Sequence, residues 1–248
     1  MSVDSNARLE RVRELLATKG SVRISALSDE FGVSAITVRR DLDTLCDLGH
    51  AQRIRGGALA LGPRQHSDRY GQQSHAKNVI ADKLLKIVED GVAISIDAST
   101  TMLRLAARLT ESSDLTVLTN SIEAARVLEP HPGVSAIVSG GRVDPRTGSL
   151  VGPLAVHAAG TMRLRQLFVS ASGIEPGYGI SDMTLEEAEL KQSFAGVSAQ
   201  IIVGIDSTKL GRSGVARSLA MEQIDVLVTE LSPSDARLAA YAKHCELL

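Results

Sequence analysis

Apolar residues near the start of the chain recur at helical spacing and predict two short amphipathic helices. The first is expected to end at Gly20, a residue suited to the left-handed conformation that terminates helices, and an extended segment over 22–24 follows. Ser25 is expected to cap the second helix and Gly32 to end it. The residues expected to face inward are Leu9, Val12, Leu15 and Leu16, then Leu27 and Phe31.

A third helix is predicted from Ser34, which can cap it, to about Asp47. Val38, Leu42 and Leu45 fall on one stripe and are expected to pack against the first two helices. A tight glycine turn followed by an arginine-bearing helix is typical of a helix-turn-helix that enters the major groove of DNA. At about 100° per residue, the outer side presents Ile36, Arg39, Arg40 and Asp43, with Thr37 on the flank.

Residues 49–58 predict a short hairpin, or wing, in which Gly49 ends the third helix and Gly56-Gly57 forms the turn. Arg53 and Arg55 share one strand face, which favours phosphate contact over an ordinary surface hairpin. On the third helix, arginines suit guanine edges or phosphates, and an exposed Ile36 suggests the hypothesis of contact with a thymine methyl. The predicted DNA-binding residues are Ser34, Ile36, Thr37, Arg39, Arg40, Arg53, Arg55, Gly56 and Gly57.

From about residue 75 onward, helical stretches alternate with short β-branched runs. Strands that are apolar throughout and separated by helices predict a mostly parallel sheet that is covered on both faces. Helices are expected over about 76–89, 100–109, 121–128, 152–162, 184–197 and 233–244. Strands are expected over 92–96, 115–118, 134–138, 166–170, 200–205 and 226–228.

Polar segments directly follow five of these strands and should therefore gather at one edge of the sheet. Serine and threonine at helix N-termini offer hydroxyl and backbone donors that suit a phosphate. Simple helix capping explains any one such loop, but five on one edge favour a polar binding site. Lys191 and Lys209 are the candidate cations for an anion there. The five segments are 97–101, 119–121, 140–142, 170–173 and 206–209.

Composition and charge refine this picture into two domains. The 248 residues, 44% of them apolar, allow one large domain or a small module with a larger one. The net charge of −2 conceals 11 Lys and Arg against 9 Asp and Glu in residues 1–69, and residues 50–64 contain three arginines without a carboxylate. We expect a winged helix-turn-helix domain over 1–61, a linker over 62–74 and a larger α/β sensor domain over 75–248.

Several classes of protein are not favoured by the sequence. Cys46 and Cys245 lie far apart, and no histidine or cysteine spacing suits a zinc site or a disulfide framework. The first twenty residues are interspersed with charges, and no apolar run approaches the roughly 20 residues of a membrane span. We therefore expect a cytoplasmic protein that needs no metal or cofactor and does not associate with a membrane.

Two parts of the chain resemble a known family. The string SAITVRRDL at 34–42, followed by RIRGGA at 53–58, closely resembles the DNA-binding head of DeoR-type repressors, although Ala51 replaces a larger apolar residue. Residues 75–230 resemble the sensor half of that group, which shares its fold with ribose-5-phosphate isomerase, glucosamine-6-phosphate deaminase and the coenzyme A transferases. Within this half, Ser99 stands where glycine is usual and Glu230 where aspartate is common.

The resemblance implies a regulator, expected to be a repressor, of a sugar or polyol operon. Its affinity for double-stranded operator DNA would respond to a phosphorylated sugar or polyol. A homo-oligomer, either a dimer or a tetramer, would place two recognition helices about 34 Å apart. The candidate effector-binding residues are Asp97, Ser99, Thr100, Thr101, Thr119, Asn120, Gly140, Gly141, Arg142, Gly173, Lys191, Asp206 and Lys209.

An isomerase or deaminase with an accessory head is the main alternative. Such an enzyme needs an acid or base at a sugar carbon, yet Ala171, Ser172 and Gly173 stand where the related isomerases are expected to have acidic catalytic residues. The nearest acid along the chain is Glu175, before a proline-glycine pair in an expected loop. A pure protein-interaction module leaves the arginines of the third helix and wing unexplained. We therefore expect binding without catalysis and assign no catalytic residues.

Overall fold

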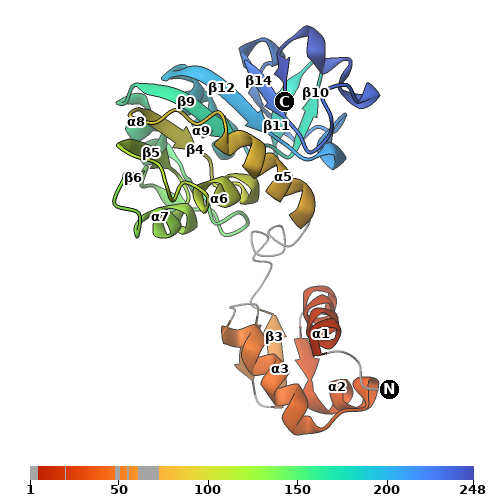
Figure 1. The fold of residues 1–248 in the computed structure, drawn as a ribbon. Helices are drawn as coiled ribbons and strands as arrows, with labels where there is room; N and C mark the ends of the chain where they lie inside the picture. The colour runs from red at the N-terminus through yellow and green to blue at the C-terminus, as the bar shows by residue number, and fades with distance from the viewer. Residues whose placement is uncertain (1–4, 20, 48–50, 55, 61–72) are drawn as a thin grey trace. The chain divides into compact units, whose positions relative to one another are not determined.

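The computed structural model describes residues 5–19, 21–47, 51–54, 56–60 and 73–248, and the chain divides into two compact units, residues 1–68 and 69–248 (Figure 1). Each unit has its own hydrophobic core and is described by itself. Gly20, Gly49, Arg55 and most of the expected linker lie outside the described residues. The domain boundaries expected at residues 61 and 75 thus stay a prediction.

The described residues of the first unit form three helices and a small antiparallel sheet of order β1-β3-β2. Its elements are α1 (Ser5–Lys19), β1 (Ser21–Arg23), α2 (Ile24–Phe31), α3 (Ala35–Asp47), β2 (Ala51–Ile54) and β3 (Gly57–Ala60). The core contains the inward stripes expected for all three helices, although Leu9 and Phe31 are only partly buried. Ala51 is 2% exposed, so the root of the wing packs into this core despite its small side chain.

Two local expectations in this unit are wrong. Ser25 does not cap α2, because β1 pairs with β3 up to Arg23 and the chain enters the helix at Ile24, whose N–H donates to the carbonyl of Gly56. Gly57 is not a turn residue, because it already pairs with Ile54. A Cβ on Gly57 would lie 2.0 Å from the carbonyl oxygen of Val22, so the residue is glycine to let β1 approach.

An ion pair that the sequence did not reveal joins α1 to α3. Arg8 and Asp41 are each 7% exposed, and the guanidinium donates to both carboxylate oxygens, at 2.6 and 3.1 Å. The hydrogen bond to Asp41 raises the pKa of Arg8 above its ordinary value. Because a buried charge without its partner is strongly destabilising, this pair fixes how α3 sits on the domain.

The second unit is built on a seven-stranded sheet of order β15-β14-β12-β9-β4-β5-β6, in which every pair is parallel. The strands are β4 (Ala93–Ile96), β5 (Leu115–Thr119), β6 (Val134–Val138), β9 (Leu164–Val169), β12 (Ser198–Gly204), β14 (Val226–Val228) and β15 (Glu246–Leu247). The helices are α5 (Ser74–Leu85), α6 (Thr100–Ala106), α7 (Ile122–Leu128), α8 (Pro153–Gly160) and α9 (Leu185–Gly196). No helix in the part of the chain described is long and apolar enough to span a bilayer.

Alternate strand residues supply two cores on opposite faces of the sheet. In β9, Leu167 and Val169 join the core under α8 and α9, whereas Phe168 joins the core under α5, α6 and α7 (Figure 1). A parallel strand covered on both faces is apolar at every position for this reason. The expected sheet class is therefore confirmed.

The predicted helix over 233–244 is wrong. Two single turns, η3 (Ala236–Leu238) and η4 (Tyr241–Lys243), stand there and lead into β15. Leu238 and Tyr241 are buried, and the Tyr241 hydroxyl donates to the carbonyl of Ile174. These anchors hold the segment against the core, and the chain must then extend to lie parallel to β14, so a continuous helix does not form.

Several short elements were not foreseen. A hairpin of β7 (Arg142–Val143) and β8 (Leu150–Val151) precedes α8. A separate antiparallel sheet has the order β10-β11-β13, with β10 (Gly173–Glu175), β11 (Gly179–Asp182) and β13 (Ala216–Leu219). Glu175 is consequently the last residue of a strand and not part of a loop. The turns η1 (Ser207–Lys209) and η2 (Met221–Gln223) complete the unit.

Candidate functional site

The outer face of α3 presents the side chains that the helical projection predicts. Val38, Leu42 and Leu45 are buried, whereas Ile36 is 61% exposed. Arg39, Arg40 and Asp43 are also exposed, and Thr37 is partly buried on the flank. The Ser34 hydroxyl accepts from the backbone N–H of Thr37 at 3.2 Å, which is the expected capping contact.

The wing arginine Arg53 is held against α3. Its Nε lies 3.2 Å from an Asp43 carboxylate oxygen, and its Nη1 donates to the carbonyl of Gly57 at 3.3 Å. Gly56 has a φ of +83°, as a tight hairpin turn requires. Arg55 lies outside the described residues. Arg53, Arg39 and Arg40 thus provide exposed positive charge on α3 and on the wing tied to it.

In the second unit, the ends of the central strands bring the predicted polar loops together. Ile96 of β4 is aligned with Thr119 of β5 on one side and with Phe168 of β9 on the other. Asp97 therefore follows β4 between those strands, where its carboxylate accepts from the N–H groups of Ser99 at 3.0 Å and Ser170 at 3.1 Å. Asp97 is 2% exposed, so its carboxyl group is buried at the strand edge.

Lys191 of α9 neutralises this buried carboxylate together with a second one, Asp182 at the end of β11. Its amine donates to Asp182 and to the carbonyl of Ser170, both at 2.7 Å, and lies 3.2 Å from Asp97. Burial alone would lower the pKa of Lys191, but Asp182, Asp97 and Glu187 outweigh burial and raise this pKa above its ordinary value. Ser218 donates to Asp182 at 2.6 Å. Asp182 and Ser218 were not among the predicted residues.

Lys209 is the more available cation. Its amine donates to the carbonyl of Ala171 at 2.8 Å and lies 3.8 Å from Asp206, and its side chain is 26% exposed. Burial lowers the pKa of Lys209 below the ordinary lysine value, and the charge of Lys191 lowers it further, against the opposite effect of Asp206. Asp206 also accepts from the backbone N–H of Thr208 and caps η1.

Two buried polar atoms near this edge have no hydrogen-bond partner among the described residues: Oδ1 of Asn120 and Oγ of Ser170. The Asn120 side chain donates to the carbonyl of Leu150 at 3.2 Å, which leaves its oxygen unused. Buried polar groups are normally paired, and an unpaired one usually meets a ligand or a water molecule. The Thr119 hydroxyl, in contrast, already has a partner, since it accepts a hydrogen bond from the N–H of Ser121.

The loop after β4 begins α6 as expected. Ser99 caps that helix by accepting from the N–H of Met102 at 3.2 Å, which gives the departure from glycine a local role. Thr100 and Thr101 are 6% and 1% exposed in its first turn. The other departure is also explained, because the Glu230 carboxylate accepts from the N–H of Ser207 and so positions the loop that contains Lys209.

The remaining predicted residues have no contact with Lys191 or Lys209 among those the structure describes, and two of the glycines allow close backbone packing. Gly140 and Gly141 have positive φ, and a Cβ on Gly141 would lie 2.6 Å from the carbonyl oxygen of Val151. Arg142 is exposed, and its guanidinium lies 3.5 Å from the carboxylate of Glu186. A Cβ on Gly173 would lie 2.1 Å from the Arg212 carbonyl oxygen, so this residue allows close backbone packing.

Comparisons with known proteins agree with both units. Residues 8–63 match the DeoR-like helix-turn-helix domain, and residues 72–231 match the DeoR C terminal sensor domain. The chain is 30% identical to the uncharacterised HTH-type transcriptional regulator YulB of Bacillus subtilis, over 93% of this chain and 91% of that one. It is 27% identical to the lactose phosphotransferase system repressor of Streptococcus mutans, over 97% and 98%. The two units thus define a helix-turn-helix transcriptional regulator with a sensor domain.

The chain belongs to the DeoR family of transcriptional regulators. A solved structure of D-ribose-5-phosphate isomerase in complex with phospho-erythronic acid is also similar, with 15% identity and a TM-score of 0.42. This similarity covers 55% of this chain and 54% of that one, and it says nothing about activity.

The cluster around Lys191 makes a prediction about stability. Lys191→Met leaves Asp97 and Asp182 buried without their counter-charge, and we expect it to reduce the free energy of unfolding by about 3–5 kcal/mol. Urea unfolding of the full chain measures this, with exposed Lys243→Met as the control, for which a change within about 0.5 kcal/mol is expected. Equal losses in the two variants would contradict the assigned role of Lys191.

Proposed function

We propose that this regulator binds operator DNA through the outer face of α3 and the wing, and that a phosphorylated sugar or polyol at the strand edge controls that binding. The DNA-binding residues are those predicted from the sequence. Ile36, Arg39 and Arg40 are exposed together, as a helix that reads a major groove requires. Thr37 and Ser34 lie at the helix start, where phosphate contacts are common.

The observation that supports the effector site best is that the Asn120 oxygen and the Ser170 hydroxyl are unpaired at the edge of the sheet where Lys191 and Lys209 bind the loop after β9. Both atoms suit the hydroxyl groups of a sugar or polyol. Lys191 is surrounded by two carboxylates and a carbonyl, so it positions the site and does not itself receive an anion. Lys209, with a single hydrogen bond among the described residues and partial exposure, is the cation we assign to the phosphate.

We further propose repression that the effector relieves, in a dimer or tetramer that presents two recognition helices about 34 Å apart. Repression, as opposed to activation, is supported by the name of a relative, the lactose phosphotransferase system repressor. A coupling of about 1–3 kcal/mol between effector and DNA is sufficient to change DNA affinity 5- to 150-fold. The cytoplasm is the compartment that this function requires.

Binding without catalysis is favoured over an isomerase. The carboxylates at the strand edge already have partners: Asp97 and Asp182 contact Lys191, and Asp206 accepts from Thr208. A general base must be able to reach a proton of the substrate, and a carboxylate within a buried ion pair is poorly placed to do so. Glu175, the acid singled out in the sequence, ends β10 and has no contact with either lysine among those the structure describes.

The DNA interface predicts a salt-dependent affinity. Binding-site selection from random duplexes identifies the operator, and fluorescence anisotropy then measures the dissociation constant between 50 and 200 mM salt. Arg39→Ala and Arg40→Ala should each weaken binding, and removal of an arginine that binds a phosphate should reduce the slope of log K against log salt by about one. The control is Arg11→Ala, an exposed arginine of α1. Unchanged affinity in both α3 variants would exclude this face as the DNA interface.

The effector site predicts proton uptake. Burial lowers the pKa of Lys209 in the ligand-free protein, and a bound anion beside the amine favours its charged form and raises that pKa again. The affinity for the anion therefore falls as the pH rises through the pKa of Lys209 in the ligand-free protein. A thermal-shift screen of phosphorylated sugars and polyols identifies the ligand. Calorimetry in buffers of different ionisation enthalpy then measures the protons taken up at alkaline pH, which Lys209→Met should abolish.

Thr100→Ala is the matched control at the helix start and should retain proton uptake while it weakens binding. Two results would contradict the proposal. One is proton uptake on ligand binding that persists in Lys209→Met. The other is chemical conversion of any sugar phosphate in the mixtures recovered from the screen, which would favour the isomerase.

A further inference from the structure

The edge strand β6 is exposed in a way that natural proteins usually avoid. Among the described residues it pairs only with β5, and its sequence Val-Ser-Ala-Ile-Val contains no charge, proline or glycine. Ile137 and Val138 are 39% and 41% exposed. Exposed edges are normally protected by charge, by proline or by short length, because their unpaired backbone groups recruit other strands. The opposite edge, β15, is protected in this way, since it has two residues and one is Glu246.

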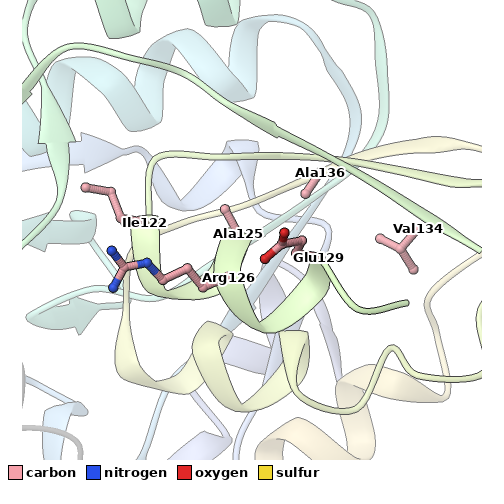
Figure 2. Close-up of a pocket in the computed structure, with 6 residues that line it drawn as sticks. All are labelled: Ile122, Ala125, Arg126, Glu129, Val134 and Ala136. Carbon is pink, nitrogen blue, oxygen red and sulfur yellow. The ribbon is translucent and has the colours of Figure 1, made fainter. Parts of the chain in front are cut away.

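An open groove of about 420 Å³ lies between β6 and α7 (Figure 2). Its apolar lining comes from both elements and consists of Ile122, Ala125, Val134 and Ala136. None of the predicted DNA-binding or effector-binding residues lines it. The unprotected strand and the groove together form one continuous surface, which we call the β6 edge.

The charges on the β6 edge are arranged so that the surface complements itself. Arg126 lies toward the Ile122 end of the groove and Glu129 toward the Val134 end (Figure 2). Both side chains are exposed, and neither forms an ion pair among the residues described. If a copy of this surface is turned around and placed opposite, Arg126 faces Glu129 at both ends. Placed in the same direction, like charges would meet.

We propose that β6 pairs in antiparallel fashion with β6 of a second copy of this chain, about a two-fold axis perpendicular to the sheet. The pairing joins the two seven-stranded sheets into one and satisfies the edge backbone groups of both copies. The two α7 helices run antiparallel on the same face, with two Arg126 to Glu129 pairs across the axis.

The occupant is a second copy because a two-fold interface uses the same patch on both subunits and must therefore be self-complementary. An unrelated partner would not require opposite charges toward the two ends of one groove. The proposal supplies a surface for the oligomer proposed above. A protein that is monomeric at all concentrations would contradict both the oligomer proposed above and the β6 interface. An oligomer whose stability is unchanged by substitutions in the β6 edge would contradict only the β6 interface.

The test is a charge exchange on the full chain, with mass measured by light scattering and the dissociation constant by analytical ultracentrifugation. Arg126→Glu and Glu129→Arg should each weaken the dimer at least about tenfold, because like charges then face each other twice. The double variant should restore the dimer. So should an equimolar mixture of the two single variants, since each then meets its opposite charge. A general loss of fold cannot produce that rescue.

Ile137→Lys should also weaken association, and Leu154→Lys provides the control, since Leu154 is 72% exposed on α8. If the wild type is a tetramer, the β6 variants should yield dimers. An oligomer that the β6 variants leave unchanged, or one that Leu154→Lys disrupts instead, would overturn the proposal.

Discussion

The arrangement of the sensor domain depends on one buried ammonium group. Lys191 faces carboxylates from the end of β4 and the end of β11, and it also binds the carbonyl after β9. Without it, the carboxylates of Asp97 and Asp182 would be buried without a counter-charge, which is strongly destabilising. Because the donors of this lysine are committed to the fold, the proposed function assigns ligand binding to Lys209 and to the unpaired groups of Asn120 and Ser170.

The two domains therefore use positive charge in opposite ways. On α3, Arg39 and Arg40 stand in solvent, where attraction to a polyanion is long-ranged and weakened by salt. At the sheet edge, Lys209 is largely withdrawn from water, and burial lowers its pKa. A small anion there gains more from each contact because water is excluded. Under the proposed function, DNA and a sugar phosphate are therefore bound by positive groups that differ in their degree of burial.

The features that repeat along the chain were predictable from the sequence. The stripe of Val38, Leu42 and Leu45 follows from helical spacing, and the continuously apolar β9 follows from a sheet covered on both faces. Contacts between distant residues were not predictable. Asp182 lies in a short antiparallel strand whose register no local pattern reveals. The helix expected over 233–244 does not form, and Tyr241 instead anchors that segment to the carbonyl of Ile174. The roles assigned to Lys209 and Arg39 remain predictions.

In the proposed function, ligand binding at the strand edge changes DNA binding by the helix-turn-helix domain. The most direct measurement is the dissociation constant of operator DNA, by fluorescence anisotropy, with and without a saturating sugar phosphate that stabilises the protein. We predict a 5- to 150-fold change in wild type, about 1–3 kcal/mol, and little change with the dephosphorylated sugar. Identical DNA affinity with and without a bound sugar phosphate would contradict it.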